Sequence, residues 1–152
     1  MAKVNLSSPS EFEDYVGKDL GESSPYEVTQ EKINMFADAT EDHQWIHVDV
    51  ERAKKESPFG GPIAHGYFSV SIIPHLLFDV LSVKGTKLII NYGLNKVRFP
   101  APVPIGKKII GKFGVVNLRD IGEGNIEVEF SAEVIVEGNE KPSCVASVLY
   151  RY

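Results

Sequence analysis

A carboxylate and an imidazole lie five residues apart in a polar stretch of this chain. Asp42 and His47 fall in residues 39–49, ATEDHQWIHVD, where apolar residues follow neither a helical nor a strand-like period. Side chains at this spacing can face one pocket and share a water molecule. The carboxylate would hold the water and the imidazole would transfer a proton, since the pKa of an unperturbed histidine is about 6.5. Loosely spaced Asp–His pairs are common, so spacing alone favours the alternative of a turn capped by Asp42 and a purely structural His47.

A glycine-rich turn stands directly before the longest apolar segment. Residues 60–66 read GGPIAHG, and residues 64–81 have the composition of a buried helix. Backbone N–H groups in the first turn of a helix lack partners inside the helix and carry partial positive charge. The N–H of Gly66 can therefore stabilise a carbonyl oxygen that gains negative charge. Alternatively, Gly66 is small because the helix packs closely there. His65 is expected to hold the turn by hydrogen bonding.

Metal chemistry fits the sequence less well. His43 and His47 are four residues apart, with Asp42 and Asp49 nearby. The zinc-protease pattern, however, needs a glutamate directly after the first histidine, and this chain has Gln44 there. Because no other set of residues has zinc-ligand spacing, we predict that no metal is bound.

Nucleophilic catalysis and phosphate binding have weak candidates. Cys144 lies in a predicted strand and is expected to be a small core residue. Ser69 and Ser71 lack the Gly-x-Ser-x-Gly turn of hydrolase nucleophiles. Lys96 and Arg98 read as solvated strand residues, and they are also the cations that could contact a cofactor phosphate.

The composition is that of an ordinary globular domain. The chain has 152 residues, 43% of them hydrophobic and 24% charged, and its formal net charge is −5 without a basic cluster, which disfavours nucleic-acid binding. The single cysteine excludes an internal disulfide, and residues 1–14 lack the apolar core of a signal peptide. The apolar segment 63–81 contains His75 and Asp79, which a membrane span does not readily carry. We therefore expect a cytoplasmic protein without a membrane segment.

Helices are predicted mainly in the first half of the chain. Thr29 is a good N-cap for a helix over residues 30–39. Residues 42–62 are predicted mainly as an ordered loop, with one short helix capped by Asp49. The long helix over 64–81 is expected to kink at Pro74, because proline removes a backbone donor.

Strands are predicted in the second half. Residues 126–136 alternate between apolar and mostly charged side chains, as in an antiparallel strand with one face in water. Further strands are expected over residues 22–29 (an edge strand), 87–99, 107–119 and 143–151. The sequence therefore predicts an α+β fold, in which one antiparallel sheet wraps over the long helix.

Two segments resemble the signatures of a known family. Residues 36–47, FADATEDHQWIH, with Ala53 six residues further on, resemble the hydratase 2 motif of MaoC-like proteins, which include the (R)-specific enoyl-CoA hydratases. Residues 61–66, GPIAHG, look like the second signature of that family. The resemblance extends from about Gly17 over nearly the whole chain, and it is closest to the nodulation protein N-like branch. It implies a single hot-dog domain over residues 1–152, with residues 1–16 as an N-terminal extension.

The resemblance also implies roles for individual residues. The family's catalytic aspartate and histidine match Asp42 and His47, and its oxyanion-hole N–H matches that of Gly66. The family motif usually reads Gly-Asp-x-Asn-Pro, whereas this chain has Glu41, Gln44 and Trp45 at the corresponding positions. We expect Gln44, Trp45, His65 and Arg98 to contact the substrate. Some members carry an aspartate-orienting serine on the central helix, where this chain has Pro74, with Ser71 one turn earlier.

The activity implied by the resemblance is reversible hydration of a trans-2-enoyl thioester to a (3R)-3-hydroxyacyl thioester. The carrier would be coenzyme A or acyl carrier protein, no cofactor would be needed beyond the substrate's own coenzyme A, and the protein would be a homodimer. Two other activities remain open. A thioesterase on the same fold would direct the water to the thioester carbon, and a non-catalytic protein would bind acyl thioesters without turnover.

Overall fold

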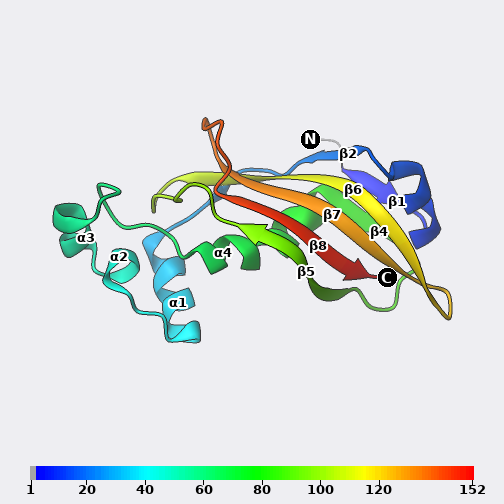
Figure 1. Ribbon diagram of the computed structural model, residues 1–152, viewed down its shortest axis with the longest axis horizontal. Helices are drawn as coiled ribbons and strands as arrows, with labels where there is room; N and C mark the ends of the chain where they lie inside the picture. Colours follow the sequence, from blue (N-terminus) through cyan, green and yellow to red (C-terminus); the bar gives the residue numbers. More distant parts are fainter. Residues whose placement is uncertain (1–2) are drawn as a thin grey trace.

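The computed structural model describes residues 3–152, and its main feature is a curved antiparallel sheet (Figure 1). The strands follow the order β2-β6-β7-β8-β5, and β3 also pairs with β6. Their bounds are β2 (Asp19–Glu22), β3 (Tyr26–Glu27), β5 (Ile90–Arg98), β6 (Lys108–Gly122), β7 (Asn125–Val136) and β8 (Cys144–Arg151). The predicted antiparallel sheet is confirmed. The single edge strand predicted over residues 22–29 is instead two short strands, β2 and β3, which are separated by the segment that contains Pro25 and both pair with β6.

Alternation of side chains explains which face of the sheet is buried. In β7, Val128, Phe130 and Ala132 are almost fully buried, whereas Ser131 between them is exposed. The β6–β7 hairpin turns at Glu123 and Gly124, which both adopt positive φ angles, of 57° and 79°. A two-residue turn of this kind matches the twist of the strands that it joins. The first strand of the hairpin therefore continues to Gly122, beyond the predicted end at residue 119, and the turn is shorter than predicted.

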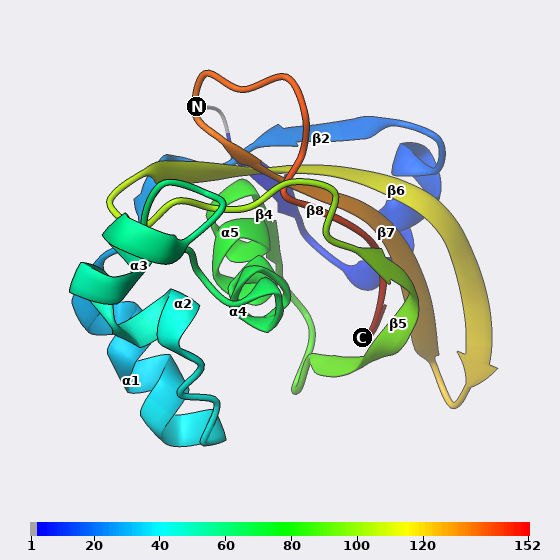
Figure 2. The same ribbon diagram turned by 60° about the vertical axis from the view of Figure 1, so that its left-hand side comes forward.

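The predicted long helix is in fact two helices, which corrects the sequence analysis. Helix α4 (Gly66–Ser71) and helix α5 (Ile73–Val80) are separated by Ile72, and neither includes Ala64 or Leu81. Pro74 lies in the first turn of α5, where a missing backbone N–H costs no hydrogen bond, so it begins a helix instead of kinking one. The two helices lie in the concavity of the sheet (Figure 2), which is the hot-dog arrangement that the resemblance implies.

The N-terminal segment is packed into the same core. Strand β1 (Val4–Leu6) pairs in parallel with β4 (Leu81–Val83), and a 3-10 helix, η1 (Pro9–Tyr15), follows it. Phe12 in η1 is fully buried, and its ring centroid lies 5.7 Å from that of Phe130 and 4.9 Å from that of Tyr152. Residues 3–16 thus contribute apolar contacts to the core.

Three short helices cluster at one end of the molecule, beyond the end of the sheet (Figure 1). They are α1 (Gln30–Thr40), α2 (Trp45–Val48) and α3 (Val50–Glu56). Two predicted caps are confirmed, since Thr29 Oγ1 accepts a hydrogen bond from Lys32 N and Asp49 Oδ1 accepts one from Arg52 N. The prediction of a loop over residues 42–62 missed α2, which is a single turn and too short to have a recognisable period.

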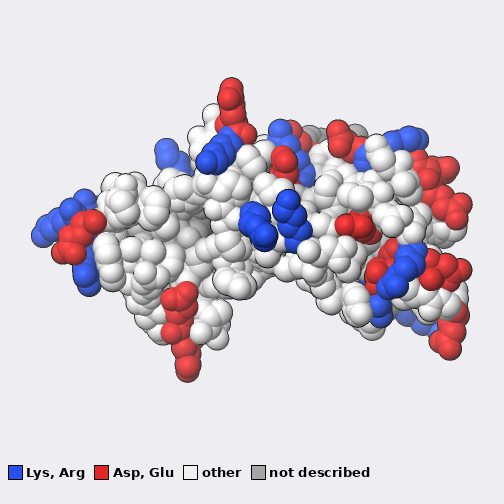
Figure 3. All heavy atoms as spheres, viewed as in Figure 1, with Lys and Arg blue, Asp and Glu red and all other residues white. Residues whose placement is uncertain are grey.

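Charged groups are unevenly distributed over the surface. On the face shown in Figure 3, basic and acidic side chains are interspersed, acidic side chains project beside α1, and the region around α4 is largely uncharged. Within residues 3–152, no helix is long and apolar enough to cross a membrane.

Candidate active site

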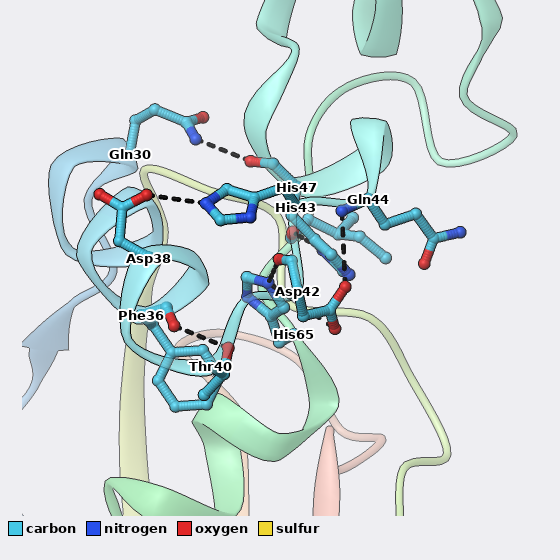
Figure 4. A network of polar contacts seen from close by, with 10 residues as sticks. Gln30, Phe36, Asp38, Thr40, Asp42, His43, Gln44, His47 and His65 are labelled. Carbon is cyan, nitrogen blue, oxygen red and sulfur yellow. Dashed lines mark hydrogen bonds and ion pairs between the residues drawn. The ribbon is translucent and has the colours of Figure 1, made fainter.

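Three side chains from separate segments meet beside the start of α4 (Figure 4). Asp42 lies in the turn after α1, His47 lies in α2, and His65 immediately precedes α4. One nitrogen or carboxylate oxygen from each lies within 4.8 Å of those from the other two. The structure thus brings together the predicted pair Asp42 and His47, and it adds His65 to the group.

The orientation of His47 is determined by a main-chain acceptor. Its Nδ1 lies 2.6 Å from the carbonyl oxygen of Ile63. Because a carbonyl can only accept a hydrogen bond, Nδ1 carries the proton and Nε2 keeps a lone pair in the neutral ring. Burial lowers the pKa of His47, and the neighbouring His65 lowers it further, against the raising effects of the Ile63 carbonyl and the Asp42 carboxylate. His47 is therefore a neutral base at physiological pH.

His65 connects the Asp42 turn to the start of α4. Its side chain is only 3% exposed, and its Nε2 donates a hydrogen bond to the main-chain oxygen of Asp42 over 2.9 Å. Its ring stacks on that of His47 with centroids 3.9 Å apart. The predicted hydrogen-bonding role of His65 is confirmed, and its partner is the residue whose carboxylate faces His47. A direct contact of His65 with substrate stays a prediction.

The Asp42 carboxylate is accessible to water. Its side chain is 55% exposed, with Oδ2 4.0 Å from His65 Nε2. Oδ1 accepts a long hydrogen bond, 3.4 Å, from the backbone N–H of Gln44. Asp42 therefore caps the turn, as the structural alternative requires, and at the same time presents a carboxylate oxygen to the two histidines.

The other proposed substrate contacts lie outside this group. Gln44 is exposed at the start of α2, and its side-chain amide points away from Asp42 (Figure 4). The ring of Trp45 is covered by the guanidinium of Arg52 at 4.3 Å from its centroid. Arg98 ends β5 and donates to the carbonyl of its neighbour Val97. Their contacts with substrate remain predictions.

Gly66 begins α4 and is also closely packed. A Cβ atom at this position would lie 2.9 Å from the ring of Phe99. The packing explanation for this glycine is therefore correct, and it is compatible with an N–H in the first turn of the helix. A pocket of about 210 Å³ adjoins Gly66, with Phe99 and the buried Ser69 in its wall. The hydroxyl of Ser71 instead donates to Tyr67 O within α4, so it does not orient Asp42.

Replacing Gly66 by Ala is expected to lower the free energy of unfolding by about 1–2 kcal/mol, because the added methyl group overlaps the Phe99 ring. The control is Gly61→Ala, since a Cβ there would meet nothing within 4 Å. Denaturant titration of these variants, of Phe99→Ala and of the double variant Gly66→Ala/Phe99→Ala measures the coupling between the two positions. Equal stabilities of the Gly66→Ala and Gly61→Ala variants would contradict the packing argument.

Supporting residues that the sequence analysis missed act largely through the main chain. Gln30, at the start of α1, donates from Nε2 to the carbonyl oxygen of His47 over 2.7 Å. Phe36 packs its ring 5.0 Å from that of His65. Phe36 lies within the motif over residues 36–47, which could have pointed to it. The residue types of Gln30 and Ile63 do not by themselves reveal that these residues support the site.

The other two reactive side chains that the sequence offered, His43 and Cys144, lie outside the site. His43 Nε2 lies 2.8 Å from Asp38 Oδ1, and this contact raises the pKa of His43. His43 therefore pairs with Asp38, and it does not form with His47 the pair of metal ligands that the sequence spacing suggested. Burial raises the pKa of Cys144 to about 11, so its thiol stays protonated and unreactive at neutral pH, as expected for a core residue.

Comparisons with known proteins agree with this geometry. The family described as "MaoC like domain" matches residues 11–138. A 3-hydroxyacyl-thioester dehydratase Z of Mycobacterium tuberculosis is 51% identical over 136 residues, which cover 90% of this chain and 89% of that protein. Nodulation protein N of Rhizobium leguminosarum bv. viciae is 38% identical over 133 residues, covering 87% and 83%. An R-hydratase structure from Pseudomonas aeruginosa superposes with a TM-score of 0.72 at 21% identity, covering 90% and 84%, which establishes the shared fold alone.

Proposed function

The chain belongs to the MaoC-like family, a family of hydratases and dehydratases, and from this premise we propose that it hydrates trans-2-enoyl thioesters reversibly to (3R)-3-hydroxyacyl thioesters. The observation that carries the proposal is the meeting of a neutral, buried His47 with the water-accessible carboxylate of Asp42. This arrangement places a base beside a carboxylate that is in contact with solvent. The named activity of the Mycobacterium relative supports the same thioester chemistry.

The proposed reaction adds one water molecule across the C2=C3 double bond. Asp42 and His47 hold one water between them, and His47 Nε2 takes a proton as the water oxygen bonds to C3. The electron pair of the C2=C3 bond moves toward the thioester carbonyl, whose oxygen gains negative charge beside the N–H of Gly66. A proton then returns to C2, and the thioester bond stays intact. No metal or redox cofactor is part of this proposal, because the carbonyl accepts the electron pair.

The direct test is hydration of crotonyl-CoA, followed by the loss of enoyl absorbance and by chiral analysis of the product. A (3R)-3-hydroxybutyryl product without free thiol is the expected result. Release of free thiol would replace the proposal by a thioesterase. Binding without turnover, across short and long acyl chains, would replace it by an acyl-thioester binding protein. The same assay with an enoyl group on acyl carrier protein determines which carrier is used.

The rate of hydration is expected to stay high below pH 6.5. Burial lowers the pKa of His47, so the neutral base persists as the pH falls, and the acidic limb of kcat/KM moves below the ordinary histidine value of about 6.5. The ionisable groups that face His47 are His65, which also lowers its pKa, and Asp42, which raises it. A profile of kcat/KM between about pH 5 and 8 measures the limb, with the unfolding temperature recorded at each pH. A midpoint above the ordinary value would contradict a buried neutral base.

We also propose that two copies pair along β5, which is an edge strand of the described sheet. Ile90, Tyr92 and Leu94 on this strand are exposed by 47%, 52% and 43%. An apolar edge with open backbone groups is a template for a second strand. The parent is expected to sediment as a dimer and Leu94→Lys to shift it toward the monomer, whereas Val116→Lys, at an equally exposed position of β6, should not. A monomeric parent would refute this pairing.

We further propose that the protein is located in the cytoplasm. This location is supported by the single cysteine, Cys144, which is buried as a free thiol.

A further inference from the structure

We propose that His65 is a positioning residue, which sets the Asp42 carboxylate against the His47 imidazole without itself touching the reacting atoms. Its ring makes one contact with each member of the pair: a hydrogen bond to the main-chain oxygen of Asp42, and a stack on the ring of His47. Neither contact uses the Asp42 carboxylate or His47 Nε2, so both groups stay available for the chemistry. That this placement matters for hydration rests on the proposed function, whereas the placement itself does not.

The Asp42 carboxylate has little else to hold it in place. Its side chain is 55% exposed, and the one hydrogen bond found for it within residues 3–152 comes from the backbone N–H of Gln44 over 3.4 Å, which is long for such a bond. The preceding residue, Glu41, has a φ angle of 61°, a conformation that residues other than glycine seldom adopt. The 2.9 Å hydrogen bond from His65 Nε2 to the Asp42 oxygen is therefore the short contact that fixes this turn.

The stack restricts a motion that the ring of His47 would otherwise keep. A single hydrogen bond, from Nδ1 to the carbonyl oxygen of Ile63, still allows the imidazole to rock about that bond. The His65 ring lies against it, with centroids 3.9 Å apart and an angle of 27° between the planes. His65 is itself fixed by packing, since it is buried and its ring lies 5.0 Å from that of Phe36. Two neighbours therefore set the direction of His47 Nε2.

The other ring nitrogen of His65 shows that stability alone does not favour a histidine here. Because the Asp42 carbonyl oxygen can only accept a hydrogen bond, Nε2 carries the proton, and in the neutral ring Nδ1 keeps a lone pair. Nδ1 is buried and has no hydrogen-bond partner in the described part of the chain. A buried polar atom without a partner costs stability, and a role in catalysis is one of the reasons for which such an atom is kept.

Two substitutions separate the hydrogen bond from the stack. His65→Gln loses the ring but keeps an N–H donor at about the reach of Nε2, whereas His65→Met has a similar reach and no donor. We expect His65→Met to lower kcat for crotonyl-CoA by about 10–100-fold at a nearly unchanged KM, because a misplacement of about 1 Å has an effect of that order. His65→Gln should recover the part of this loss that comes from the hydrogen bond. His75→Met removes an exposed imidazole of α5, and this control should keep the parent kcat.

A second measurement shows whether His65 acts through Asp42. In an Asp42→Asn background, the difference in kcat between His65→Gln and His65→Met should close, because the carboxylate that the hydrogen bond positions is already gone. The unfolding temperature of every variant is recorded. If His65→Met does not fold, His65→Asn takes its place, since the amide of Asn reaches only to the position of Nδ1 and cannot contact the Asp42 oxygen.

The positioning role and the proposed function can fail separately. With an active parent, equal kcat values for His65→Gln and His65→Met would overturn the positioning role, and so would a loss confined to KM, which would indicate a direct contact of His65 with substrate. An inactive parent would refute the proposed function. Crystal structures then decide the placement: the Asp42 carboxylate should be displaced by about 1 Å in His65→Met relative to His65→Gln. Coinciding carboxylates would overturn it.

Discussion

Replacing His47 by Gln is expected to lower kcat/KM for enoyl-thioester hydration by about 10²–10⁴-fold, and Asp42→Asn should have an effect in the same range. Gln keeps a polar side chain but has no basic lone pair for the proton of the attacking water. Asn keeps the shape of Asp42 and removes its negative charge. Steady-state kinetics with crotonyl-CoA measures both losses.

The control for these changes is again His43→Gln, whose imidazole is exposed and engaged with Asp38. We expect it to retain the parent activity. Unfolding temperatures of all three variants separate a loss of chemistry from a loss of fold. Parent-like hydration by either site variant would show that the pair does not carry the reaction.

Truncating Phe12 to Ala is expected to lower the free energy of unfolding by about 3–5 kcal/mol, which is the usual effect of removing a buried aromatic ring. Phe12 is fully buried although it lies in a short 3-10 helix near the chain terminus. Its ring packs against those of Phe130 and Tyr152, which stand on and directly after the central strands. The space it leaves cannot close without moving those strands.

Urea-induced unfolding measures this effect, with Glu13→Ala as the neighbouring control. Glu13 belongs to the same 3-10 helix but is exposed, so its truncation should change stability by less than about 0.5 kcal/mol. A small loss in the Phe12→Ala variant would mean that residues 3–16 are an appendage that the domain does not need.

Much of the fold is predictable because the pattern of burial is local. The alternation in β7 places Val128, Phe130 and Ala132 on the inner face, and the structure confirms it. The long helix was predicted wrongly at Pro74, since a proline inside an apolar run has the same sequence pattern whether it kinks one helix or begins another. In the structure, the turn at Ile72 ends the first helix, so Pro74 falls in the first turn of the second. Strand β1 was missed because three residues that pair with β4, far along the chain, carry too little pattern.

The sequence by itself determined which side chains could do chemistry at this site. Asp42, His47 and Gly66 stand in short motifs, and their types and spacing already indicate a base, a carboxylate and a helix start. Only the tertiary structure decided which groups orient the two side chains. His65 meets Asp42, and His47 meets Ile63, through main-chain carbonyl oxygens. Every residue has such an oxygen, so residue type cannot reveal which one orients a histidine. That information exists only once α2 has folded against the segment that precedes α4.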